Sequence, residues 1–235
     1  MAIILNRTSL AAISFGDGTN THIPVYYHDT ERNIRETLYD TGSNPPWHQN
    51  TEATVGKGKL DSGIAAVSWS GGTQVQIRVY CLSSEGYIVE VTTPVQLIVI
   101  LDSSSQTLLT GAYFTAVPNS ELAATQSEAI SGTGISAALT ATILPRVYFQ
   151  VSGAKFVEWV SDSQGNWTQS SFTCQGTYVN DSCTAALGSG TTNIWVFATN
   201  DQNRITQTEY TNPGAGRRLS NSQPPTPCSP ILLSH

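Results

Sequence analysis

Apolar and polar residues alternate in a short motif that occurs four times along the chain, and a polar turn follows each copy. The copies are Ile23–Tyr26, Ile77–Tyr80, Pro145–Tyr148 and Ile194–Phe197. After each turn comes a second segment of similar length, and these segments are Asn33–Glu36, Tyr87–Glu90, Lys155–Glu158 and Arg204–Gln207. Two such segments joined by a polar turn predict an antiparallel β-hairpin.

A segment of small and apolar residues precedes each predicted hairpin. These segments are Leu10–Phe15, Ile64–Trp69, Ile135–Thr140 and Cys183–Leu187. An inner strand of small residues followed by a hairpin, repeated at roughly fifty residues, is typical of a β-propeller blade. Small residues suit the innermost strands, because blades converge at the centre of a propeller.

The sequence therefore predicts an all-β protein, a shortened or incomplete β-propeller with about four recognisable blades. The repeats lie near residues 10–57, 64–118, 135–180 and 183–213. We expect one propeller domain over residues 1–213 and an irregular tail over 214–235. A single β-sandwich with accidental internal similarity is the alternative. Equal offsets disfavour it, since positions 24 and 36, 78 and 90, 146 and 158, and 195 and 207 are all twelve residues apart.

Composition narrows the function classes. The 235 residues include 11 Lys and Arg against 17 Asp and Glu, for a net charge of −6. Only 12% of the residues are charged, which is about half the share usual in soluble domains. So little basic charge argues against a nucleic-acid binder, and the content of aromatic and apolar residues argues against a disordered chain.

Targeting signals are weak. Residues 1–7 lack the basic region and the apolar length of a signal peptide, and the apolar run 95–101 is far shorter than a membrane span. We therefore expect no membrane insertion and a cytoplasmic or non-classically secreted chain. Three Asn-x-Ser/Thr sequons would matter only in a secreted protein, at Asn6, Asn166 and Asn180.

The four cysteines lack the paired spacing of a zinc site. Cys174 and Cys183 could bridge a hairpin or remain free thiols, and spacing alone does not decide between these.

In the second and third repeats, the twelve-residue offset places an Arg beside a Glu. Arg78 with Glu90, and Arg146 with Glu158, would lie on adjacent antiparallel strands, close enough to share one bound group. A cross-strand ion pair that only stabilises the blade is the alternative, and an exposed pair contributes only some tenths of a kcal/mol. Two pairs at identical positions in a chain with so few charges favour binding.

Several strings resemble the fungal fucose-specific lectins, and the resemblance covers most of residues 3–212. The strings are Leu10–Ser14, Asn33–Glu36, Ile77–Cys81, Arg146–Gln150 and Glu158–Trp167. The resemblance implies a six-bladed propeller that binds L-fucose in clefts between adjacent blades, with no catalysis, metal or cofactor. Because a sixth blade is not recognisable, an incomplete circle would have to close by self-association, which leaves a homo-oligomer open.

By this resemblance, Arg78 and Arg146 donate to the sugar's ring and hydroxyl oxygens, and Glu90 and Glu158 accept from its hydroxyls. A neutral sugar both donates and accepts hydrogen bonds, so a charged donor beside a charged acceptor suits it. The partners implied are fucosylated glycans or glycoproteins.

The resemblance also implies that a neighbouring blade places an aromatic ring against the apolar face of fucose. Trp167 would serve the second-repeat cleft, and Tyr210 would serve the third-repeat cleft.

Two repeats depart from the pattern. Pro24 replaces the Arg and leaves Glu36 without its partner, while Trp195 and Gln207 replace both charged residues. We expect these two positions to bind sugar poorly or not at all.

The sequence suggests three alternatives to a lectin. Asp40–Ser43 matches the aspartic-protease motif, with Asp61–Gly63 as its twin, but 21 residues between the carboxylates do not make two lobes, and Asp-Thr-Gly is a common turn. A glycoside hydrolase needs two carboxylates, whereas each repeat offers one beside an Arg that would lower its pKa. A propeller used only as a protein-interaction scaffold is the remaining alternative. The sequence therefore predicts a lectin, not an enzyme.

Overall fold

The computed structural model describes residues 4–16, 19–49, 54–71, 74–96, 115–116, 128–140, 144–172, 174, 176–188 and 193–211. The elements in these ranges are β-strands, and they form four antiparallel sheets. No helix in these ranges is long and apolar enough to cross a membrane. The predicted tail over 214–235 lies outside the described residues.

The chain divides into two compact units. The first comprises Met1–Glu85 and Val89–Ser120, and the second comprises Gly86–Ile88 and Glu121–His235. The expected single domain over 1–213 stays a prediction.

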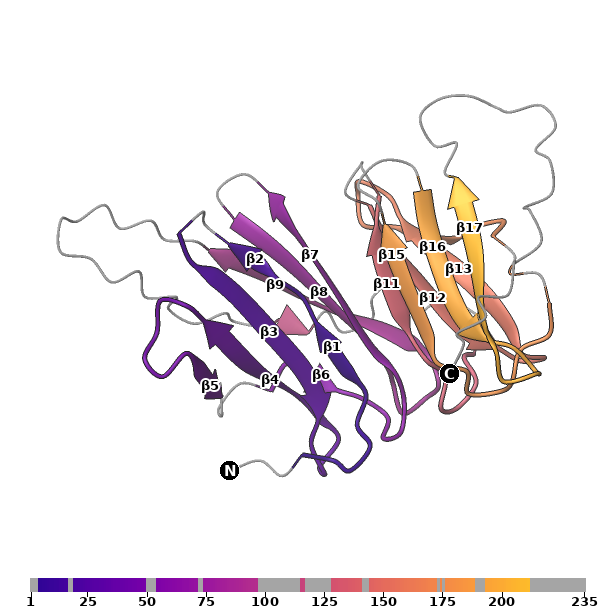
Figure 1. Cartoon of the computed structure of the whole chain (residues 1–235), viewed down its shortest axis with the longest axis horizontal. Coiled ribbons are helices and arrows are strands. Elements are labelled where there is room, and N and C mark those ends of the chain that lie inside the picture. The colour runs from indigo at the N-terminus through magenta and orange to yellow at the C-terminus, as the bar shows by residue number, and fades with distance from the viewer. Residues whose placement is uncertain are drawn as a thin grey trace, which may run out of the picture. The chain divides into compact units, whose positions relative to one another are not determined.

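Sheets 1 and 2 correspond to the first two predicted repeats (Figure 1). Sheet 1 contains β1 (Leu10–Ala12), β2 (Phe15–Gly16), β3 (Thr21–His28), β4 (Asn33–Asp40), β5 (Trp47–Gln49) and β6 (Gly56–Lys57), with its main path in the order β1-β3-β4-β5. Sheet 2 contains β7 (Ile64–Gly71), β8 (Gln74–Leu82), β9 (Ile88–Gln96) and β10 (Thr115–Ala116), in the order β10-β9-β8-β7.

Sheets 3 and 4 correspond to the last two repeats. Sheet 3 contains β11 (Ser136–Leu139), β12 (Pro145–Val151), β13 (Lys155–Ser161) and β14 (Trp167–Gln169), in that order. Sheet 4 contains β15 (Thr184–Gly188), β16 (Asn193–Thr199) and β17 (Ile205–Thr211). In every sheet the small-residue strand pairs with the first strand of the hairpin, as the sequence predicts.

The core of the first unit decides which way the charged residues point. Ile77, Val79 and Cys81 of β8 are buried in a cluster with Tyr26 and Ile34 of sheet 1. Successive side chains of a strand point to opposite faces. The residues between them, at positions 78 and 80, therefore project from the other face of sheet 2.

In the second unit the corresponding face of sheet 3 packs inward. Tyr148 of β12 and Phe172 join Ile194 and Val196 of β16 in one buried cluster, together with Ala138 of β11. Tyr148 of sheet 3 thus packs against apolar side chains of sheet 4.

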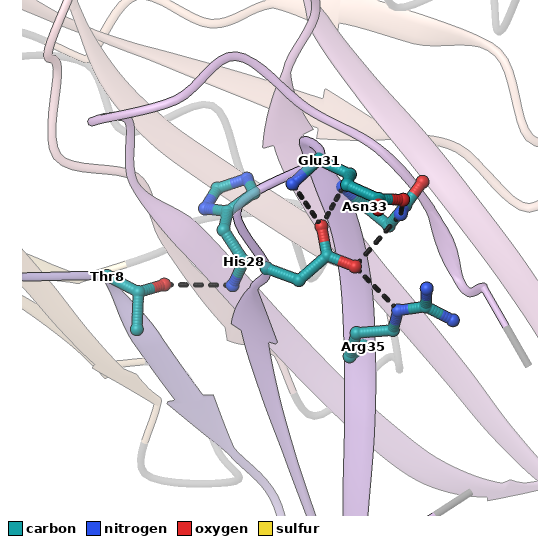
Figure 2. Close-up of polar contacts among 6 residues, drawn as sticks. Thr8, His28, Glu31, Asn33 and Arg35 are labelled. Atoms are coloured by element: carbon teal, nitrogen blue, oxygen red, sulfur yellow. Dashed lines mark hydrogen bonds and ion pairs between the residues drawn. The ribbon is translucent and has the colours of Figure 1, made fainter. Parts of the chain in front are cut away.

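A recurring turn precedes the first strand of each sheet. Its residues Arg7, Asp61, Gly132 and Asp181 have positive φ angles of 61°, 58°, 82° and 60°. A Ser or Thr follows each of them. In three sheets its hydroxyl oxygen accepts the N–H at the end of the central strand, as Thr8 does from His28 at 2.8 Å (Figure 2).

This turn explains the position of Asp61, one of the two Asp residues that match the protease motif. Asp61 holds the left-handed turn position, which Asp tolerates better than most residues. Asp40 is the last residue of β4, and its Oδ1 accepts the Gly42 N–H of the following turn at 2.8 Å. Both carboxylates therefore have structural positions. Cys174 and Cys183 are free thiols.

Candidate functional site

In sheet 3 the strand register brings an Arg, a Tyr and a Glu together. Tyr148 lies opposite Glu158, and Arg146 lies two residues earlier, opposite Val160. Side chains two residues apart share a face, so Arg146 reaches Glu158 along the diagonal. Its Nη1 lies 2.9 Å from Glu158 Oε1.

The carboxylate of Glu158 is enclosed by donors. Its Oε1 accepts the Tyr148 hydroxyl at 2.6 Å as well as the Arg146 guanidinium. Its Oε2 accepts the Ser170 hydroxyl. The side chain of Glu158 is 0% exposed and that of Arg146 is 8% exposed. The ion pair is almost completely buried, and two hydroxyl groups also donate hydrogen bonds to its carboxylate.

The pair in sheet 2 is looser and more open. Arg78 Nε lies 3.3 Å from Glu90 Oε1, and the two side chains are 21% and 14% exposed. Arg78 Nη1 also donates to the Ile77 carbonyl at 3.2 Å. The guanidinium carbon lies 5.0 Å from the ring centroid of Trp69, which is a cation–π geometry. Trp69 comes from β7, so an aromatic of the same sheet supports Arg78.

Burial and charge act in opposite directions on Glu90. Burial raises the pKa of Glu90, while Arg78 and a hydrogen bond from Tyr80 lower it, and the pKa is raised on balance. Arg78 lowers the pKa of Glu90, as the sequence predicts, but desolvation outweighs this effect and the pKa lies above its usual value. Burial and the nearby Glu90 in turn raise the pKa of Tyr80 well above its usual value.

Sheet 1 keeps the Tyr and the Glu but not the Arg. Tyr26 lies opposite Glu36, in the same register as the pair in sheet 3. Glu36 is 6% exposed, and Pro24 occupies the Arg position. Burial raises the pKa of Glu36, and the hydrogen bond with Tyr26 lowers it only in part.

The neighbouring Arg35 does not replace the missing cation. It points to the opposite face, where its Nε donates to Asp29 Oδ2 at 2.8 Å (Figure 2). Asp29 also accepts the backbone N–H groups of Glu31 and Asn33 at 2.8 and 2.9 Å. Burial raises the pKa of Asp29, but the bonds from Asn33 and Arg35 outweigh it and lower this pKa. The Asp29 cluster thus stabilises the turn of the hairpin.

Sheet 4 has neither the cation nor the hydroxyl. Phe197 lies opposite Gln207, and Trp195 lies opposite Glu209. The strand register is that of sheet 3, so the difference lies in the side chains.

The two predicted aromatic partners remain predictions. Trp167 starts β14, lies opposite Ser161 and is 5% exposed. It belongs to the second unit, whereas Arg78 belongs to the first. The backbone of Tyr210 lies in β17 opposite Ile194, and its side chain is outside the described residues.

Sequence reasoning missed two members of the arrangement. The Tyr was visible, because it ends the motif in three repeats and Phe ends it in the fourth. Its spacing of two residues from the Arg already implies a shared face. Ser170 gave no such signal. It lies twelve residues after Glu158, and the other repeats have His48, Asp102 and Leu219 at that offset.

Metal binding has no support in the described part of the chain, which contains no group of three or more His, Cys, Asp or Glu side chains that could hold an ion. The Arg–Tyr–Glu arrangement consists of hydrogen-bond donors and acceptors.

Comparison with known proteins identifies the family of the chain. The model of the fungal fucose-specific lectins matches residues 4–131, more than half of the chain. The chain belongs to this family. A fucose-specific lectin of Aspergillus oryzae is 27% identical over 213 residues, which is 88% of this chain and 59% of that protein. The fucose-specific lectin of Aleuria aurantia is 33% identical over 87 residues, which is 37% of this chain and 27% of that protein.

Solved structures agree on the fold. A variant of the Aleuria aurantia lectin in complex with α-methyl-L-fucoside superposes with a TM-score of 0.72 at 21% identity, over 91% of this chain and 63% of that one. Another crystal structure of that lectin, described as a six-bladed β-propeller, gives a TM-score of 0.69. The prediction of a β-propeller, incomplete relative to the six-bladed fold, is confirmed. The chain spans about three-fifths of the length of the Aspergillus relative.

Proposed function

We propose that this chain is a non-catalytic lectin that binds L-fucose-containing glycans at Arg78/Glu90 and Arg146/Glu158. The observation that carries the proposal is the matched Arg–Tyr–Glu arrangement of sheets 2 and 3. Membership in the family of fucose-specific lectins supports fucose as the ligand. The relatives' binding partners, which include a fucoside and Fucα1-6GlcNAc in solved complexes, indicate which glycans to test first.

The arrangement suits a neutral sugar. Each guanidinium supplies several N–H donors in one plane, and each carboxylate accepts from sugar hydroxyls. The Tyr hydroxyl donates to the Glu, as Tyr148 does to Glu158 at 2.6 Å, and so fixes the acceptor before the sugar arrives. Single sites of this kind are weak, so several sites on one multivalent glycoprotein surface would supply avidity.

Catalysis is not part of the proposal. Glycoside hydrolysis requires two carboxyl groups about 5–10 Å apart across the scissile bond, and each pair contributes one. Its raised pKa would suit Glu90 to the role of general acid, but the pair offers no second carboxylate to act as nucleophile or base. Incubation with fucosylated oligosaccharides should release no sugar, which mass spectrometry of the products would check.

Calorimetric titration with methyl α-L-fucoside tests the sites. Arg78→Ala and Arg146→Ala should each remove one site, and the double variant should lose binding. Arg35→Ala is the matched control, because it breaks an Arg–carboxylate pair of 2.8 Å, close to the 2.9 Å of Arg146–Glu158, on the opposite face of sheet 1. Circular dichroism would check that each variant folds. Arg146→Lys is a milder variant, because it keeps the positive charge.

Two outcomes would contradict this proposal in different ways. Full binding by the folded double variant would show that the sites are elsewhere. If the wild-type chain binds neither methyl α-L-fucoside nor any fucosylated glycan on an array, the lectin function itself is wrong and the scaffold alternative gains support.

A further inference from the structure

Among the described residues, Glu158 has one hydrogen-bond donor that Glu90 lacks, Ser170. We propose that the Ser170 hydroxyl competes with the sugar for Glu158 Oε2 and so weakens the Arg146/Glu158 site. This inference rests on the proposed function and assigns Ser170 as the residue that sets the affinity of that site.

The first step is the occupancy of the carboxylate. Glu158 Oε1 already accepts from both Tyr148 and Arg146. An ionised carboxylate offers about four lone-pair positions, two on each oxygen. The acceptor capacity left for a sugar hydroxyl is therefore on Oε2, and Ser170 donates to that oxygen.

The second step is the direction of the Ser170 proton. The Ser170 Oγ accepts the backbone N–H of Phe172 at 2.9 Å. The Ser170 hydroxyl has one proton, and it donates this proton in a hydrogen bond to Glu158 Oε2. The backbone also anchors the residue, since the Ser170 N–H donates to the Glu158 carbonyl at 3.0 Å. The hydroxyl is thus held in place from both sides.

The third step is the segment Ser170–Phe172, which covers the carboxylate. Phe172 is 6% exposed, and its ring meets that of Tyr148 edge-on, with 5.3 Å between centroids. Tyr148 itself binds Glu158, so the segment closes over the pair through both a hydroxyl and a ring. Because Glu158 is 0% exposed, a sugar hydroxyl reaches Oε2 only after neighbouring groups move. Ser170 is the group that donates to that oxygen.

Sheet 2 provides the contrast within the same chain. The Glu90 side chain is 14% exposed, against 0% for Glu158. The wild-type protein should therefore bind fucoside more tightly at Arg78/Glu90 than at Arg146/Glu158.

The experiment isolates the covered site. In the full-length Arg78→Ala protein, methyl α-L-fucoside is titrated against the parent and against Ser170→Ala, Ser170→Gly, Ser170→Thr and Ser171→Ala. Removing the hydroxyl should tighten binding about tenfold, the scale of one hydrogen bond to a charged group. Ser170→Thr keeps the hydroxyl and should match the parent. Ser171 is exposed and adjacent, so Ser171→Ala should also match the parent.

The outcomes separate the two proposals. If wild-type protein binds fucoside but neither Ser170→Ala nor Ser170→Gly tightens the covered site, the role of Ser170 is overturned and the lectin function stands. Weaker binding in these variants would overturn it too, by making Ser170 a supporting residue. If no variant and no wild-type protein binds fucoside, both proposals are wrong. A purely structural Ser170 would change the melting temperature without tightening binding.

Discussion

Sheets 2 and 3 carry Arg, Tyr and Glu at the same sequence spacing, yet their ion pairs differ. In sheet 3 the pair is 2.9 Å long, with Glu158 fully buried, whereas in sheet 2 it is 3.3 Å long, with both side chains partly exposed. Strand register determines which residues meet. The two pairs differ in their further contacts, because Arg78 lies over the ring of Trp69 and Glu158 accepts a hydrogen bond from Ser170. Repetition in sequence therefore produces equivalent positions but not equivalent sites.

Replacing the Arg of each pair by Ala should give the largest difference between the sheets, measured as the loss in free energy of unfolding. Arg146→Ala leaves the Glu158 carboxylate buried without its counter-charge, and breaking such a pair costs about 3–5 kcal/mol of unfolding free energy. Arg78→Ala should cost about 1 kcal/mol or less, because water reaches that pair. Urea unfolding of both variants measures the difference between the two losses in free energy of unfolding. Equal losses would show that the two pairs are alike in solution.

Removing the hydroxyl from the Tyr tests the comparison with sheet 4, which has Phe at this position. Tyr148→Phe gives sheet 3 the ring of Phe197 but takes a donor from Glu158. A hydrogen bond to a charged group contributes about 1.5–3 kcal/mol, and we expect a loss in that range.

Tyr39→Phe is the control for this variant, since the ring of Tyr39 packs edge-on against Trp47 and its hydroxyl has no hydrogen bond to another described residue. It should change the free energy of unfolding little. An equal loss in both variants would attribute the effect to ring packing instead of the carboxylate.

Much of the fold and half of the site were predictable from the sequence. The offset of twelve fixes a hairpin register, and the register places Arg146 diagonally to Glu158. Alternation of side chains then puts Tyr148 on the same face. These are local consequences of strand geometry, so a repeat pattern is enough to reveal them.

The rest depends on packing between segments without a shared pattern. Trp69 and Ser170 reach the pairs from other strands or their ends, and neither position is conserved in type among the four repeats. The direction of the pKa shift of Glu90 depends on how deeply the carboxyl is buried. The presence of an Arg partner in the sequence does not reveal that burial. For Trp167, the predicted sugar contact would have to be made by a ring that is 5% exposed.

Restoring the cation in sheet 1 should have the smallest effect and sharpen the comparison most. Pro24 lies opposite Leu38, as Arg146 lies opposite Val160, so Pro24→Arg would place a guanidinium diagonally to Glu36. Burial now raises the pKa of Glu36 above its usual 4.5. A folded-state pKa above the unfolded value means that this carboxyl makes folding more favourable as pH falls through the folded-state pKa toward 4.5.

The new cation should lower the pKa of Glu36 and remove part of that pH dependence, because it stabilises the carboxylate. A carboxyl NMR titration measures the pKa directly, and calorimetry with methyl α-L-fucoside would show whether one further site per chain appears.

Pro24→Gln is the matched control, with similar length and no charge. If the Arg and Gln variants give Glu36 the same pKa, the guanidinium does not reach the carboxylate, and equivalent register in sheets 1 and 3 does not give equivalent side-chain geometry. A lowered pKa without a further site would instead show that an Arg–Tyr–Glu arrangement is insufficient for sugar binding, and that the residues covering each pair decide it.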